Sequence, residues 1–193
     1  MWKYCCKITQ LLRLLPPVMK LWTFQSAELE NFLDKYEVIH ADWRLTPVNW
    51  RPAYQWMATE MERHGIALNG HAPVWAWHSC GKWYGQPTVG TARSLLTDYQ
   101  LLNGIVNIEL EVPDELCLLS SYGRFNELLD EVIDYGAIRH PECHYEMFSL
   151  PLEMEPNDDV QAAIPCIRKE WIREIRPVDI KPGKDDYDWE MLV

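Results

Sequence analysis

The sequence predicts an α+β fold, in which a mainly antiparallel, twisted or split sheet is flanked by about four helices. Short segments with strand-like alternation are separated by turn residues, and amphipathic segments of helical period lie between some of them. The two kinds of segment do not alternate regularly enough for a doubly wound parallel sheet. With 193 residues, 48% hydrophobic and 24% charged, the chain is expected to form one globular domain.

Strands are predicted wherever apolar and polar residues alternate. LWTFQ at residues 21–25 opens the sheet, and VWAWH at 74–78 is expected to be central or nearly central. IVNIELEV at 105–112 has the cleanest alternation, with its apolar side chains pointing inward. Further strands are expected at 38–42, 116–120, 145–150 and the end of 160–178.

Helices are predicted where apolar residues recur every three or four positions. The first is capped by Ser26 and buries Leu29, Phe32, Leu33 and Tyr36. The others are expected at 52–65, 91–104 and 123–136, with a short helix at the start of 160–178. Between them, SCGKWYGQPTVG at 79–90 is a long irregular connection of the kind that often carries function.

The first eighteen residues, MWKYCCKITQLLRLLPPV, resemble a signal peptide only superficially. Basic residues precede an apolar run, but Arg13 interrupts the run and no small-residue cleavage site follows. The run is also too short to span a bilayer. We expect a non-native or disordered extension at 1–18 with the biological start at Met19, a single domain at 19–180 and an acidic, frayed tail at 181–193.

Charge and cysteine content limit the possible partners and location. The net charge of −11 argues against a general nucleic-acid backbone binder, because such proteins use clustered Lys and Arg. Cys80, Cys117, Cys143 and Cys166 are scattered, without the spacing of a disulfide framework. They are expected to be reduced thiols, which predicts a cytoplasmic protein without a membrane segment.

Familiar catalytic signatures are missing from the sequence, which has no GxGxxG, phosphate loop, nucleophile elbow or HExxH. Cys80 could be a nucleophile with His78 as its base, but a bend and a third, orienting group would be needed, so a buried inert thiol is the simpler interpretation. Glu109 and Glu111 share a strand face. A solvated sheet face explains them more simply than an acid–base pair.

Two segments hold residue types that bind zinc: His71, His78 and Cys80 in one, and His140, Cys143 and His144 in the other. The patterns HxC and HxxCH fit the tight ligand pairs of a structural zinc site only loosely. A lone histidine on a strand face is more often part of the core or surface. We therefore expect no metal site, and the alternative is zinc bound by His78, Cys80, His140 and Cys143.

Several motifs together resemble an uncharacterised bacterial family, domain of unknown function 3841. They are MKLWTFQ at the first strand, PAYQWM, PVWAWH and IELEVPDELCLLS. The likeness extends from Met19 to about Val178. In that family the chain starts at the first strand, which implies that residues 1–18 are an extension. The resemblance implies no activity, because the family has no settled function.

The order of elements also resembles the ADP-ribosyltransferase-like fold, through the opening strand, the helix that runs into HAD and the closing VQAAIPCIRKEWIREI. The resemblance implies an NAD site in a cleft between two small sheets. Thr23 and Gln25 would line it from the first strand, with Trp77 on a middle strand. Arg93 would hold a phosphate and Gln161 would contact the ribose.

This sequence departs from that enzyme pattern at two places. The first strand lacks the usual His or Arg, and Gln161 stands where a catalytic Glu would fall. An amide cannot supply the negative charge that stabilises an oxocarbenium-like transition state. The resemblance therefore implies nucleotide binding and leaves transferase activity open.

A different class of function also fits the aromatic content. Ten tryptophans and nine tyrosines exceed what such a core normally needs, and these rings often line pockets or interfaces. In a non-catalytic interaction module, Trp75, Trp77, Trp83 and Tyr84 would form an aromatic patch for a peptide or protein. The expected partner is thus a nucleotide or a protein, with a structural zinc domain as the third alternative.

Overall fold

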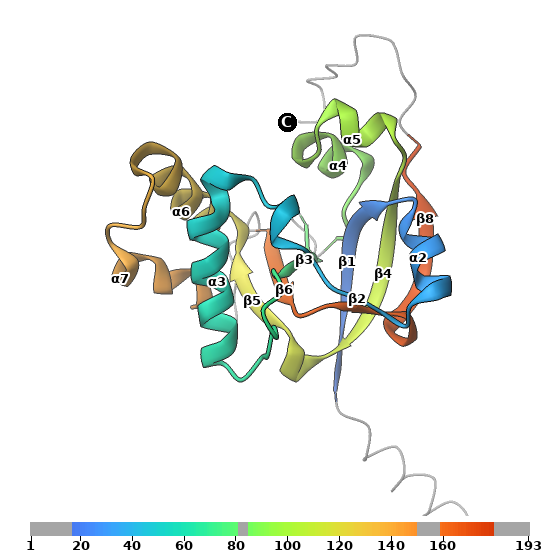
Figure 1. The fold of residues 1–193 in the computed structure, drawn as a ribbon, viewed down its shortest axis with the longest axis horizontal. Coiled ribbons are helices and arrows are strands. Elements are labelled where there is room, and N and C mark those ends of the chain that lie inside the picture. Colours follow the sequence, from blue (N-terminus) through green and yellow to red (C-terminus); the bar gives the residue numbers. More distant parts are fainter. Residues whose placement is uncertain (1–16, 81–84, 150–158, 180–193) are drawn as a thin grey trace, which may run out of the picture.

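A computed structural model of the chain describes residues 17–80, 85–149 and 159–179. The strands are β1 (Val18–Ser26), β2 (Val38–Ile39), β3 (Val74–Ser79), β4 (Ile105–Pro113), β5 (Leu118–Ser121), β6 (Val160–Ile164), β7 (Ile167–Arg168) and β8 (Ile172–Pro177). Six of them form a sheet in the order β5-β6-β3-β1-β4-β8, and β2 pairs with β7 (Figure 1). All these pairs are antiparallel, which confirms the predicted α+β class.

The described residues contain more helices than the sequence predicted. The α-helices are α2 (Leu29–Lys35), α3 (Arg51–Arg63), α4 (Val89–Leu95), α5 (Asp98–Leu102), α6 (Tyr122–Tyr135) and α7 (Pro141–His144). Short 3-10 helices are η1 (Trp43–Leu45), η2 (Val48–Trp50), η3 (Asp114–Leu116), η4 (Tyr145–Phe148) and η5 (Lys169–Trp171). The excess arises from α7 and from the division of one predicted helix into α4 and α5.

The main sheet is split between β1 and β3. All nine residues of β1 pair with β4, whereas β1 meets β3 in register only where Trp22 lies opposite Trp77. One half is therefore β5-β6-β3 and the other is β1-β4-β8. In Figure 1, α3 and α6 lie beside the first half, and α4 and α5 lie beyond the start of β4.

Two hydrophobic clusters cover opposite faces of the β5-β6-β3 half. Buried apolar residues of α3 and α6 pack on the face that carries Ala163. Leu29 and Leu33 of α2 belong to the cluster on the other face, with Ala162 and Ile164 of β6 and the buried side chains of β4. Both faces of β6 are thus covered, so this strand lies fully inside the protein.

The burial of β6 overturns the short helix expected at the start of 160–178. All five residues of β6 are buried. A strand covered on both faces is a continuous apolar run, so it lacks the alternation by which half-exposed strands are recognised. The closing strand predicted near residue 178 is confirmed as β8.

The strand expected at 145–150 is also wrong, because its described part forms η4. A 3-10 turn brings residues three positions apart onto one side. Tyr145 and Phe148 accordingly both contact the ring of Trp56, at centroid distances of 5.6 and 5.7 Å. Met147 between them is fully buried.

The first helix is shorter and less buried than expected. Ser26 does not cap α2, whose N-cap position is held by Glu28, although the Ser26 hydroxyl accepts from the Glu28 N–H at 3.3 Å. Leu29 and Leu33 are buried, but Phe32 is 51% exposed. A helix of seven residues that packs through one i, i+4 pair leaves its other apolar side chains outside.

The ends of the chain relate to the predicted boundaries as follows. Val18, the last residue of the predicted extension, pairs with Pro113 at the start of β1. The rest of the extension up to residue 16 and the predicted tail at 181–193 lie outside the described residues. Within the described part of the chain, no helix has the length and apolar character needed to cross a membrane.

The helix predicted at 91–104 is broken at Thr97. The Thr97 side chain accepts from the Gln100 N–H at 3.3 Å, and Gln100 in turn accepts from the Thr97 N–H at 3.0 Å. This reciprocal capping box starts a new helix instead of continuing the previous one.

We expect Thr97→Ala to lower the free energy of unfolding by about 1 kcal/mol, because the substitution removes the N-cap oxygen. The measurement is urea denaturation followed by tryptophan fluorescence. Thr59→Ala is the matched control, since Thr59 is exposed inside α3 and Ala is the better helix former there. If 91–104 were one continuous helix, both variants would be as stable as the parent or more stable.

Candidate functional site

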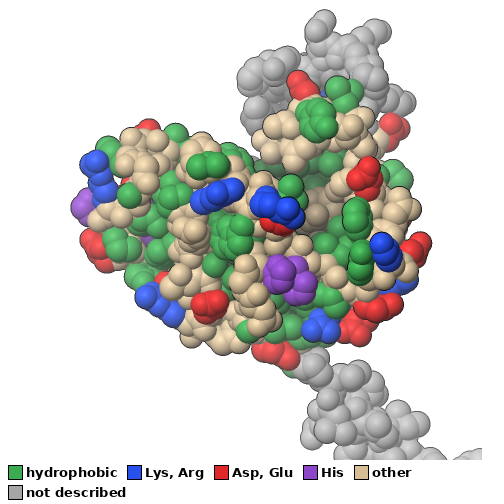
Figure 2. Space-filling view, in the orientation of Figure 1, with side chains coloured by type: hydrophobic (Ala, Val, Ile, Leu, Met, Phe, Trp, Pro, Cys, Tyr) green, Lys and Arg blue, Asp and Glu red, His purple; other side chains and the backbone are tan. Residues whose placement is uncertain are grey.

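A cavity of about 410 Å³ lies at the split in the main sheet. Its lining comes from β1, β3 and β6, from the start of α3, the end of α4 and one face of α6. Figure 2 shows the surface hollowed between the α4–α5 segment and the half of the molecule that carries α3. The volume falls in the range typical of small-molecule sites.

Three of the five residues predicted for a ligand site line this cavity: Thr23, Trp77 and Gln161. They come from β1, β3 and β6 and are 1%, 7% and 5% exposed. Trp77 and Gln161 lie opposite each other in the β3–β6 ladder. The topology thus gathers side chains that are far apart in the sequence.

Gln25 and Arg93 are not among the lining residues. Gln25 supports the site indirectly, because its Nε2 donates to the Thr23 Oγ1 at 2.8 Å. Arg93 is exposed on α4, one position before the lining residue Ser94. It has no hydrogen-bond or ion-pair partner within the described ranges.

A side-chain hydrogen bond spans the split. Thr23 Oγ1 donates to the backbone carbonyl of Trp75 at 2.8 Å, which links β1 to β3 where their ladder is reduced to one residue pair. The Thr23 hydroxyl both donates and accepts, so its position is fixed from two sides. Thr23 therefore links β1 to β3, the two strands between which the cavity lies.

Gln161 is fixed at one end and available at the other. Its Nε2 donates to the hydroxyl of Ser120, a fully buried residue on β5, at 3.2 Å. The carbonyl oxygen Oε1 has no hydrogen-bond partner among the described residues. An amide held in this way can accept a hydrogen bond from a ligand in the cavity.

Seven of the seventeen described lining residues are aromatic. The Trp77 and Tyr122 rings meet edge to face at 4.9 Å, and Trp75 contacts Phe125 at 4.6 Å and Tyr54 at 5.3 Å. Burial raises the pKa of Tyr54 to about 12, so its hydroxyl stays neutral. Aromatic side chains in such a lining can pack against a flat ligand.

The same geometry changes the interpretation of the tryptophans that could have formed a surface patch. Trp75 is half-buried and Trp77 is buried, and both belong to the cavity wall. Trp83 and Tyr84, the other two members of that predicted patch, lie outside the described residues.

Several lining residues were missed in the sequence: Trp50 and Tyr54 at the start of α3, and Tyr122, Asn126 and Asp130 on α6. The repeat of Tyr122, Asn126 and Asp130 at every fourth position places them on one helix face, which was a usable signal. Nothing in the sequence indicated that this helix face lies against β3 and β6.

The residues of the zinc alternative are not gathered into a site. His78 and Cys80 lie at the end of β3, while His140 and Cys143 are exposed beside α7. Among the described residues no three His, Cys, Asp or Glu side chains are grouped so that they could hold a metal ion. His144, near Cys143 in the chain, instead contacts Glu131, with Nε2 and Oε2 2.5 Å apart.

Two pairs of side chains were considered for catalysis, Glu109 with Glu111 and Cys80 with His78, and the structure gives them other neighbours. Glu109 binds the ammonium of Lys20 at 2.8 Å, and Glu111 accepts from Arg173 at 2.7 Å. These are ion pairs on a partly solvated sheet face. Burial lowers the pKa of His78, whose Nδ1 lies 3.4 Å from the Ser79 hydroxyl.

Comparison with known proteins gives one match. The family model described as Domain of unknown function (DUF3841) matches residues 20–137. No curated protein and no solved structure gives a significant match to the chain.

We expect Cys80 to resist alkylation in the native protein. Burial raises the pKa of its thiol from 9.0 to about 12, with the charge of Asp159 adding to the shift, so the reactive thiolate is scarce at pH 8. Iodoacetamide at pH 8 should modify the exposed Cys143 before Cys80, as followed by peptide mass spectrometry. If Cys80 were alkylated as fast as Cys143, this prediction would be wrong and a nucleophilic role for Cys80 would be supported.

Proposed function

The chain belongs to the family described as a domain of unknown function, and we propose from its cavity that it binds a nucleotide, NAD. One observation carries the proposal. Thr23, Trp77 and Gln161, which a likeness in element order had suggested for an NAD site, lie together in the lining of a single cavity. Such convergence from three strands is the arrangement that a binding site requires.

The size and lining of the cavity favour one end of the dinucleotide. At about 410 Å³ the cavity lies near the lower end of the range for small-molecule sites, so part of NAD would remain outside. A planar base would stack on the Trp77 and Tyr122 rings, which meet at 4.9 Å. Gln161 would accept a hydrogen bond from a ribose hydroxyl through Oε1.

The pyrophosphate would lie at the mouth of the cavity, near α4. Arg93 is exposed there and unpaired among the described residues, next to the lining residue Ser94. A guanidinium suits phosphate oxygens because it donates two parallel hydrogen bonds. Arg93 would thus contribute to affinity for the dinucleotide but not for the base.

We propose binding without cleavage of the glycosidic bond. Gln161 is neutral, and its amide nitrogen is already committed to Ser120. A neutral amide cannot stabilise the positive charge that develops when the bond between nicotinamide and ribose breaks. The chain would then act as an NAD-binding module.

The first test is isothermal titration calorimetry with NAD, together with chromatography for released nicotinamide. We expect saturable binding and no release. Gln161→Ala should weaken binding by about 2- to 10-fold, the usual contribution of a neutral hydrogen bond. Gln55→Ala is the matched control, because Gln55 lies on the exposed face of α3 and does not line the cavity. Absence of binding by the parent protein would refute the proposal.

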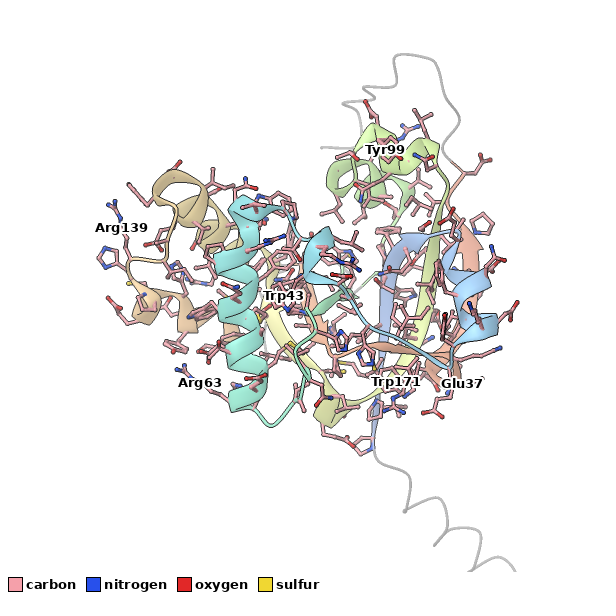
Figure 3. The ribbon with its side chains drawn as sticks, viewed as in Figure 1. Glu37, Trp43, Arg63, Tyr99, Arg139 and Trp171 are labelled. Atoms are coloured by element: carbon pink, nitrogen blue, oxygen red, sulfur yellow. The ribbon has the colours of Figure 1, made fainter. Side chains whose placement is uncertain are left out.

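A second test separates the phosphate contact from the cavity. Arg93→Ala should weaken NAD binding by about 10-fold or more, since hydrogen bonds to charged groups are worth about 1.5 kcal/mol or more, and should leave nicotinamide riboside unaffected. Arg139→Ala is the control, because Arg139 projects at the outer edge of the molecule, away from α4 (Figure 3). Equal losses for both ligands would show that Arg93 acts through the fold.

A further inference from the structure

The charge carried by the side chains that line the cavity indicates which end of NAD enters it. Its lining combines many aromatic rings with a single carboxylate, that of Asp130, and the described lining residues include no Lys, Arg or His. We propose that the cavity selects a planar organic cation, so that NAD enters by its nicotinamide ring in the oxidised, positively charged form. This inference deepens the proposed function and rests on the same cavity.

The aromatic wall provides the attraction. The Trp77–Tyr122 and Tyr54–Trp75–Phe125 contacts place indole and phenol rings around the cavity. The face of an aromatic ring carries negative electrostatic potential. It therefore attracts a positively charged ligand ring more strongly than it attracts a neutral ligand ring.

Asp130, an exposed residue, adds a carboxylate to the lining. It lies on α6 one turn after Asn126, and both residues line the cavity. Asp130 forms no ion pair or hydrogen bond with any residue in the described ranges. A carboxylate without a protein partner can therefore attract a cation that enters the cavity.

Apart from Arg93 on α4, which is exposed and unpaired among the described residues, the basic residues of the surrounding helices have other partners. On α6, Arg124 pairs with Glu146 at 2.9 Å, and at the far end of α3, Arg63 pairs with Glu60 at 2.6 Å. At the start of α3, Arg51 donates its Nε to the carbonyl of Thr46. None of these guanidinium groups lines the cavity, and neither does Arg93, so Asp130 is the one charged side chain among the described lining residues.

The two redox forms of NAD differ in the charge of the nicotinamide ring, and this lining would distinguish ligands by that charge. The oxidised nicotinamide ring is a flat pyridinium with a positive charge, whereas the reduced ring is neutral. An anionic ring would be repelled by Asp130 and would find no cation in the wall. Selection by charge therefore predicts a preference among ring types that does not depend on the rest of the dinucleotide.

The experiment uses three small probes of nearly the same shape: the 1-methylnicotinamide cation, neutral nicotinamide and the nicotinate anion. Binding to the full chain is followed by calorimetry and by tryptophan fluorescence. We expect the cation to bind about 2- to 30-fold more tightly than nicotinamide, the range of cation–π contributions, and nicotinate to bind most weakly. Equal affinities, or no binding of the cation, would overturn the inference.

Asp130→Asn isolates the carboxylate. It should weaken binding of 1-methylnicotinamide by about 2- to 5-fold, as expected for an exposed ion pair, and leave nicotinamide unchanged. Asp134→Asn is the matched control, because Asp134 is exposed one turn further along α6 and does not line the cavity. Equal effects of the two variants on the cation would contradict a local role for Asp130.

Comparison of the oxidised and reduced dinucleotides separates this inference from the proposed function. A preference for oxidised NAD over its reduced form supports both. If both forms bind equally and the small probes show no order, NAD binding stands and charge selection is wrong. If 1-methylnicotinamide binds preferentially but NAD does not bind, the cavity selects cations and the proposed function is wrong.

Discussion

The near-loss of pairing between β1 and β3 is the constraint on which the architecture depends. Strands that pair along their whole length leave no room between them, whereas here one residue pair, Trp22 with Trp77, joins two sheet halves. The Thr23 hydroxyl replaces part of the missing ladder by binding the Trp75 carbonyl. This side-chain bond satisfies a backbone acceptor while the strands diverge, and the divergence is what allows a cavity to reach the centre of the fold.

Helices α3 and α6 provide further parts of the cavity wall beside the split in the sheet. α3 and α6 pack on one face of β5-β6-β3 and bring Tyr54, Tyr122 and Asp130 to the opening. Their core residues are apolar, so their position is fixed by burial rather than by the polar groups that they present. The chemistry of the cavity is therefore carried by residues on elements held rigid for a different reason, which favours a preorganised site.

The sequence predicted most elements but few of their spatial relations. Strands with one exposed face, such as β4, and helices with long apolar stripes, such as α3, were recognised because their period reflects burial. β6 was mistaken for a helix because burial on both faces removes that period. Thr23, Trp77 and Gln161, which a likeness in element order suggested for a ligand site, line the cavity, whereas Gln25 and Arg93 do not, and ligand binding by these residues stays a prediction. The contribution of α6 depended on packing between distant segments, which no local pattern encodes.

The split also bears on how the two sheet halves open. Thr23 belongs to the half that contains β4 and β8, whereas Trp77 and Gln161 belong to the half that contains β5. The backbone pairing between the halves is limited to one residue pair, and a hydrophobic cluster with members from both halves also joins them. A molecule that touches all three side chains would act as a non-covalent cross-link, because opening either half would then also require its dissociation. Occupancy would thus add a further link between the two halves.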